Sequence, residues 1–178
     1  ARMTNTQTSF GEYFDSLSDM LCFGVAPALL IYLSSLSMFS SGYLVKVSYI
    51  ACFIYIASTA IRLARFNSRN QTTDKKYFIG LASPAAAAIL ICYVWLLADL
   101  NVDISSYVLL TILLIVTLSI LMISNIAYIS FKDINLKQKV PYIMLFTISL
   151  IISFISFDPP KVLFIFFLLY GLSGPSFY

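Results

Sequence analysis

The sequence predicts an all-α fold, a polytopic transmembrane helix bundle with about six spanning helices. Of the 178 residues, 60% are hydrophobic and only 11% are charged, whereas about 25% of the residues in a soluble domain are charged. The mean hydropathy is +0.91. The apolar residues fall into long runs, and a spanning helix needs about 20 of them. A membrane protein is the class that fits these values.

We expect a helix in each of six apolar segments, which short polar connections separate. The segments are residues 10–39, 43–66, 83–99, 104–131, 141–157 and 160–172. Ser83 is a candidate N-cap, and Pro84 would then take the first helical position, where its missing N–H costs nothing. The last two segments are short and are joined by Asp158-Pro159-Pro160. They form either a tight outer hairpin or shorter, tilted spans.

The charges of the loops predict the orientation of the bundle. With the N-terminal segment in the cytoplasm, only Lys46 and Lys161 lie on the far side of the membrane. The cytoplasmic side then holds Arg2, Arg62, Arg65, Arg69, Lys75, Lys76, Lys132, Lys137 and Lys139. The positive-inside rule favours this arrangement. We expect one membrane domain over residues 1–178, with its functional residues near the cytoplasmic face.

The composition also excludes several kinds of site. The chain has no histidine, so a general base must be a carboxylate, Lys, Tyr or Cys. Cys22, Cys52 and Cys92 lie apart in apolar runs without a CxxC pair, which argues against a disulfide framework or a zinc site. The net charge of +3 is too small to indicate a nucleic-acid partner. No Gly-rich phosphate loop of the GxxxxGK[ST] type is present.

Two aspartates stand at the start of the first apolar segment. Gly11, Asp15 and Asp19 are spaced i, i+4, i+8, which places them along one stripe of a helix. The carboxylates would lie about 6 Å apart along the axis, close enough to reach one or two divalent cations. Two other interpretations remain open, solvated acids at a helix N-terminus and an intramembrane acidic pair of a transporter or proton relay.

A second group of charges lies at the end of the 43–66 segment and just beyond it. Arg62, Arg65 and Arg69 have i, i+3, i+7 spacing and project to one side of a helix. Arginine binds phosphate or carboxylate through a bidentate fork. Snorkelling side chains that anchor the cytoplasmic end of a helix would have the same spacing.

The spacing of the first nineteen residues resembles a known family signature. Ala1-Arg2, eight residues, Gly11, three residues, Asp15, three residues and Asp19 are similar to the second part of the CDP-alcohol phosphatidyltransferase pattern, D-x-x-D-G-x-x-A-R-x(8)-G-x(3)-D-x(3)-D. The first part, D-x-x-D-G, would precede Ala1. We therefore expect this chain to be N-terminally truncated, to lack upstream helices and to be inactive alone.

Three further stretches resemble the phosphatidylserine synthase branch of that family, which is integral to the membrane. They are Phe23-Gly24-Val25-Ala26-Pro27, Arg62-Leu63-Ala64-Arg65-Phe66-Asn67 and Gly80-Leu81-Ala82-Ser83-Pro84-Ala85-Ala86. The chain departs from the branch at Ala82, where Pro is usual, and at Cys22, where Ser is common. Pro27 also lies inside the helix over residues 1–39, which we call the signature helix. It should kink this helix or free a carbonyl.

The resemblance implies a metal-dependent transferase of phospholipid biosynthesis. It would use CDP-diacylglycerol and L-serine at the bilayer and form phosphatidylserine and CMP. A divalent cation, magnesium or manganese, would be held by Asp15 and Asp19, and Asp19 would also be the catalytic base. Ala1, Arg2 and Gly11 would bind the nucleotide of the CDP-lipid. Arg62, Arg65 and Asn67 would bind the acceptor or a phosphate.

The resemblance further implies a homodimer in the bacterial cytoplasmic membrane, with the active site facing the cytoplasm. Two alternatives to transfer to serine remain. One is a family member with another acceptor, glycerol 3-phosphate or inositol phosphate. The other is a small membrane transporter.

Overall fold

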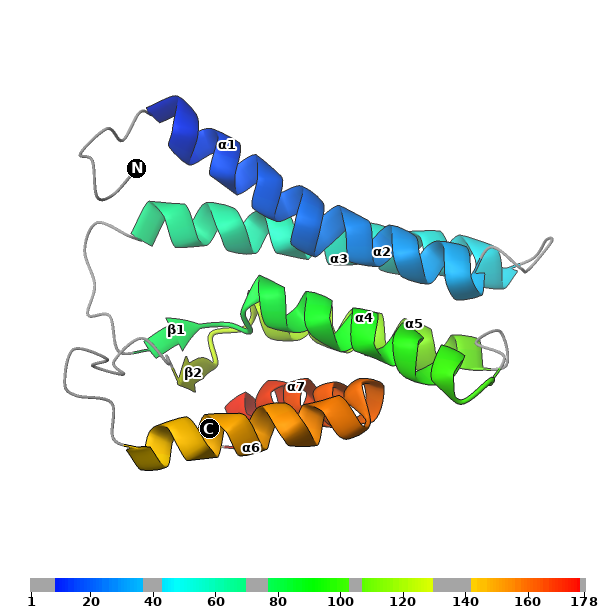
Figure 1. Ribbon diagram of the computed structural model, residues 1–178. Helices are drawn as coiled ribbons and strands as arrows, with labels where there is room; N and C mark the ends of the chain where they lie inside the picture. The colour runs from blue at the N-terminus through cyan, green and yellow to red at the C-terminus, as the bar shows by residue number, and fades with distance from the viewer. Residues whose placement is uncertain (1–8, 37–42, 70–76, 103–106, 130–141, 177–178) are drawn as a thin grey trace.

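The computed structural model describes residues 9–36, 43–69, 77–102, 107–129 and 142–176 (Figure 1). The first helical segment combines α1 (Ser9–Met20), the π-helical turn η1 (Leu21–Val25), α2 (Ala26–Ile31) and a second π-helical turn, η2 (Tyr32–Leu36). The remaining elements in chain order are α3 (Tyr43–Arg69), β1 (Tyr77–Ile79), α4 (Ser83–Asp99), α5 (Val108–Ile123), β2 (Ala127–Ile129), α6 (Tyr142–Phe157) and α7 (Pro159–Ser176).

The fold class is confirmed, because each of the six predicted segments contains a helix and the whole fits a helical membrane bundle. Among the described residues, Tyr13–Ser34 and Tyr43–Ser68 are long and apolar enough to cross a membrane. α4, α5 and α7 are shorter apolar helices. Figure 1 shows α1 and α2 running beside α3, with α4 and α5 next to them and α6 and α7 beyond.

The structure differs from the sequence prediction in the segment over residues 104–131. Its helix, α5, ends at Ile123, and the chain then becomes extended and forms β2. β2 pairs antiparallel with β1, in the register Tyr77↔Ile129. The prediction of one helix through this segment was wrong at its end. An apolar run does not reveal that contacts from a distant part of the chain stop the helix.

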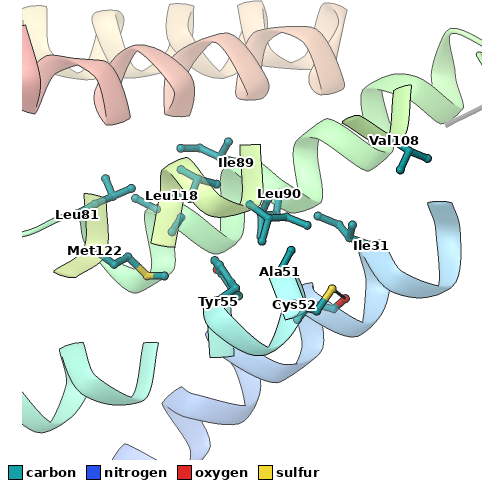
Figure 2. Close-up of a cluster of buried hydrophobic side chains, with 14 of the residues drawn as sticks. Ile31, Ala51, Cys52, Tyr55, Leu81, Ile89, Leu90, Val108, Leu118 and Met122 are labelled. Atoms are coloured by element: carbon teal, nitrogen blue, oxygen red, sulfur yellow. Dashed lines mark hydrogen bonds between the residues drawn. The ribbon is translucent and has the colours of Figure 1, made fainter. Parts of the chain in front are cut away.

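The core lies where α2, α3, α4 and α5 meet, as Figure 2 shows. Tyr55 of α3, Ile31 of α2 and Met122 of α5 have no exposed surface. Leu81, which immediately precedes α4, is equally buried. α3 packs mainly against α5, and α4 packs mainly against α7. This core fixes the end of the bundle at which α1, α3 and the start of α4 come together.

Pro27 lies in an irregular part of the first helical segment, and α3 supplies a hydrogen bond there. Proline has no N–H to donate within a helix, and Pro27 lies just after the π-helical turn η1, in which the N–H of Ala26 donates to the carbonyl of Leu21. The hydroxyl of Tyr55 donates a hydrogen bond to the carbonyl of Phe23 in this turn, at 3.0 Å. Gly24 lets the two helices approach, since a Cβ there would lie 3.2 Å from the side chain of Thr59. The irregular turn is therefore stabilised by α3.

Replacing Tyr55 with Phe should destabilise the fold, because the Phe23 carbonyl would lose the bond from the Tyr55 hydroxyl. We expect a loss of about 1–2 kcal/mol in the free energy of unfolding, measured by chemical denaturation in detergent. Tyr49→Phe is the matched control on the same helix. Its hydroxyl accepts a hydrogen bond from the hydroxyl of Tyr32 at 2.6 Å, in an exposed position. Equal losses in the two variants would contradict the role given to Tyr55.

Candidate functional site

The predicted stripe of Gly11, Asp15 and Asp19 lies on α1, as its spacing required. Gly11 and Asp15 are exposed, and Asp19 is half-buried. The four-residue spacing on a regular helix keeps the two carboxylates on one face, one turn apart. Asp19 lies close enough to Asp15 and to Arg62 of α3 for their charges to interact. The half-buried carboxylate therefore lies within electrostatic range of a cation on the neighbouring helix.

Arg62 is the buried cation of this region. Only 9% of its surface is exposed, and its Nη1 donates to the hydroxyl of Ser83 at 2.8 Å. Its Nε–H is buried and has no hydrogen-bond partner among the described residues. An unsatisfied charged donor costs free energy in an apolar interior. This orphaned donor is what a site for an anionic group would contain.

Arg65 lies one turn further along α3 but points to a different partner. Its Nη1 donates to the carbonyl of Ile123 at 3.1 Å and to the side-chain oxygen of Asn125 at 3.2 Å. Its Nη2 reaches the carbonyls of Met122 and Ser124 at 3.4 and 3.3 Å. The guanidinium therefore sits at the C-terminal end of α5. The structure separates the two arginines that the sequence placed in one site.

Asn67, at the end of α3, contacts the aspartate helix itself. Its side-chain amide donates to the hydroxyl of Ser16 at 2.8 Å. Ser16 lies between the two aspartates in the sequence, so this bond ties α3 to the part of α1 that carries the carboxylates. Ala1 and Arg2, which the sequence also predicted for the site, lie outside the described residues.

The sequence missed two residues at this end of the bundle. Ser83 was predicted to cap α4, but Ala82 occupies the N-cap and Ser83 begins the helix. The hydroxyl of Ser83 accepts from Arg62 instead. Tyr170 of α7 lies close enough to Arg62 to interact electrostatically. A serine before a proline signals a helix start, but no sequence pattern indicates that it meets an arginine of another helix.

Tyr128 of β2 holds α7 in place at this end. Its ring lies 5.7 Å from that of Tyr170, and its hydroxyl donates to the carbonyl of Gly171 at 3.0 Å. Burial, with a smaller effect from Tyr170, raises the pKa of Tyr128 to about 12. The hydroxyl therefore stays protonated and available as a donor. The contact places Tyr170 beside Arg62.

Asp15 and Asp19 have the chemistry to supply two of the ligands of a divalent cation. Their carboxylate oxygens are the hard ligands that magnesium and manganese prefer. Within the described ranges, no three His, Cys, Asp or Glu side chains gather into a cluster. Magnesium is commonly bound by one or two carboxylates together with the phosphates of a substrate. Two carboxylates one turn apart, one of them exposed, fit that pattern.

Comparison with known proteins identifies the family. The CDP-alcohol phosphatidyltransferase family matches residues 1–131. A CDP-diacylglycerol–serine O-phosphatidyltransferase of Helicobacter pylori is 38% identical over 152 residues, which is 85% of this chain and 62% of that protein. The Methanocaldococcus jannaschii protein of the same name is 34% identical over 174 residues, 98% of this chain and 73% of its own length.

An archaetidylserine synthase of Methanothermobacter thermautotrophicus is 35% identical over 119 residues, 67% of this chain and 45% of that protein. The chain thus spans about 62% of the length of the Helicobacter pylori relative. The family match includes α1 to β2, and with them the aspartate stripe, Arg62 and Ser83. The chain belongs to the CDP-alcohol phosphatidyltransferase family.

Proposed function

We propose that the protein transfers the phosphatidyl group of CDP-diacylglycerol to the hydroxyl of L-serine and releases CMP. The observation that carries this proposal is the half-buried Asp19 on α1 within electrostatic range of the buried Arg62 on α3. Relatives whose names describe transfer to serine support the choice of acceptor. The family signature on α1 argues against the transporter interpretation.

Each residue of the site has a proposed role in this reaction. The family is generally dependent on a divalent cation, and a bound magnesium or manganese ion would neutralise charge on the diphosphate. Asp15 and Asp19 would hold that ion. Gly11 leaves the face of α1 open for the nucleotide, which Ala1 and Arg2 would also contact.

Asp19 would accept the proton of the serine hydroxyl as its oxygen attacks phosphorus. The new bond joins the serine oxygen to phosphorus, and the phosphorus–oxygen bond to CMP breaks. Arg62 presents a buried Nε–H without a partner among the residues that the structure describes, which suits an anionic group of the acceptor or a phosphate. Asn67 would act by holding Ser16 and thus α1. The absence of histidine from the chain agrees with a carboxylate base.

The surroundings of the reaction follow from the same proposal. The family is membrane-associated and two described helices can span a bilayer. The acyl chains would therefore remain in the lipid. We propose that the site faces the cytoplasm at a bacterial cytoplasmic membrane, because the positive-inside rule favours the basic loops on that side. The unit would be one membrane domain over residues 1–178, with the signature helix at 1–39, in a homodimer.

An acceptor panel with controlled metal tests this proposal. The full-length protein in nanodiscs, given CDP-diacylglycerol and one labelled acceptor at a time, should form labelled lipid with serine and release CMP. EDTA should lower the rate at least about 100-fold, since the ion stabilises the transition-state charge, and magnesium or manganese should restore it. Transfer to glycerol 3-phosphate or inositol phosphate instead of serine would contradict the acceptor. An undiminished rate in EDTA would contradict the role of the metal.

A further inference from the structure

We propose that Arg65 is a positioning residue. It fixes the C-terminal end of α5, and through that end it holds the start of α4 and Ser83 against Arg62. From the family resemblance we expected Arg65 to bind the acceptor or a phosphate directly. The kinetic part of this inference rests on the proposed transfer to serine.

The first observation is the set of partners of the last α5 carbonyls. A helix leaves its last four carbonyls without helical donors. The carbonyl of Ile120 accepts from the N–H of Ser124 at 2.9 Å, and that of Leu121 accepts from the N–H of Leu81 at 3.1 Å. The two remaining carbonyls, of Met122 and Ile123, accept from Arg65. The positive charge also suits the negative end of the helix dipole.

The second observation is that the end of α5 and the residues just after it hold the segment that leads into α4. The N–H of Gly80 donates to the carbonyl of Ile126 at 2.8 Å. A Cβ on Gly80 would lie 2.9 Å from Nη2 of Arg65 and 2.5 Å from the carbonyl oxygen of Met122. The backbone of Gly80 therefore lies directly on the arginine and on the carbonyl that it binds.

The third observation connects this segment to Arg62. Ser83 follows Gly80 by three residues, is fully buried and accepts the bond from Nη1 of Arg62. Arg62 and Arg65 lie one turn apart on α3, so each holds one end of the same short segment. Because the Nε–H of Arg62 has no partner in the described part of the chain, the bond to Ser83 sets its direction. Loss of Arg65 would move Ser83 and misdirect Arg62.

The test compares single and double variants of the full-length protein in the serine assay. Arg65→Gln should raise the KM for serine about fivefold, a change of about 1 kcal/mol, with the kcat largely retained. Ser83→Ala should raise it by a similar factor. The double variant should stay near fivefold, because both changes act on Arg62 through one segment. Lys46→Gln, which removes an exposed charge at the other end of α3, is the control and should leave the KM unchanged.

Hydrogen exchange supplies a readout that needs no substrate. In Arg65→Gln the amides of Gly80 and Leu81 should exchange at least about tenfold faster than in the wild type. The acceptor of Leu81 lies in the last turn of α5, and the acceptor of Gly80 lies in the segment between α5 and β2 that follows the released helix end. Both amides should be unaffected in Lys46→Gln. A wild-type protein that transfers nothing to serine would overturn the proposed function alone, because this measurement would still decide whether Arg65 holds the segment.

Two results would overturn the positioning role. One is a KM for serine raised about 25-fold in the double variant, the product of the two single effects, together with unchanged hydrogen exchange at Gly80 and Leu81. That result would show that Arg65 contacts the acceptor directly. The other is faster exchange with an unchanged KM, which would show that Arg65 stabilises α5 without directing Arg62.

Discussion

Replacing Asp19 with Asn in the full-length protein is expected to lower the rate of phosphatidylserine formation at least about 1,000-fold. A positioned general base contributes about 10²–10⁴ in rate, and Asp19 would also hold the metal ion. Asparagine keeps the size of the side chain and removes both the base and the negative charge. Binding of CDP-diacylglycerol, measured with a labelled lipid in nanodiscs, should be largely retained. The rate is measured with labelled serine.

The matched control is Asp99→Asn, which changes an exposed aspartate at the C-terminal end of α4. Its rate should stay within about twofold of the wild type, since surface substitutions away from a site have small effects. A wild-type rate in Asp19→Asn would show that another group accepts the proton. Equal losses in both variants would show that the effect comes from general damage to the fold.

Replacing Gly80 with Ala should have the largest effect on stability. Gly80 has φ +82, a backbone conformation that costs a residue with a Cβ about 1–2 kcal/mol. The new Cβ would lie 2.5 Å from the carbonyl oxygen of Met122, a backbone atom of α5 that cannot rotate away. We expect the free energy of unfolding to fall by about 3–5 kcal/mol. Chemical denaturation in detergent, followed by circular dichroism, measures this loss.

Gly171→Ala on α7 is the control for this substitution. There the added Cβ would meet only the tip of the Ile89 side chain, at 3.2 Å, and a side-chain tip can move by a few tenths of an ångström. A loss below about 1 kcal/mol is expected. A Gly80→Ala protein as stable as Gly171→Ala would contradict the close contact between Gly80 and α5.

The elements that the sequence predicted well are those that depend on neighbours along the chain. Long apolar runs predicted the helices, and the four-residue spacing of Asp15 and Asp19 predicted their common face on α1. Pro27 indicated an irregularity in the first helical segment, because its missing N–H disturbs the turn before it. These effects are local, so one sequence is enough to predict them.

The features that the sequence did not predict depend on contacts between distant segments. The pairing of β1 with β2 joins residues about fifty positions apart. Arg65 and Arg62 have the same chemistry and nearly the same surroundings in the sequence. Only the packing of α5 and α4 against α3 directs one to helix carbonyls and the other to Ser83. Spacing places a side chain on a helix face, but it does not identify the partner on the next helix.

The π-helical turn η1 has a consequence for the direction in which the carboxylates point. Asp19 and the buried Gly24 are five residues apart, which on a regular helix would place them about 140° apart around the axis. A π-helical turn holds an additional residue, so Asp19 lies nearer to the packing face of Gly24, Ala28 and Ile31 than a regular helix would place it. Deleting one residue from Leu21–Val25 would rotate the carboxylates about 100° away from α3. The protein would keep every functional side chain and lose their alignment.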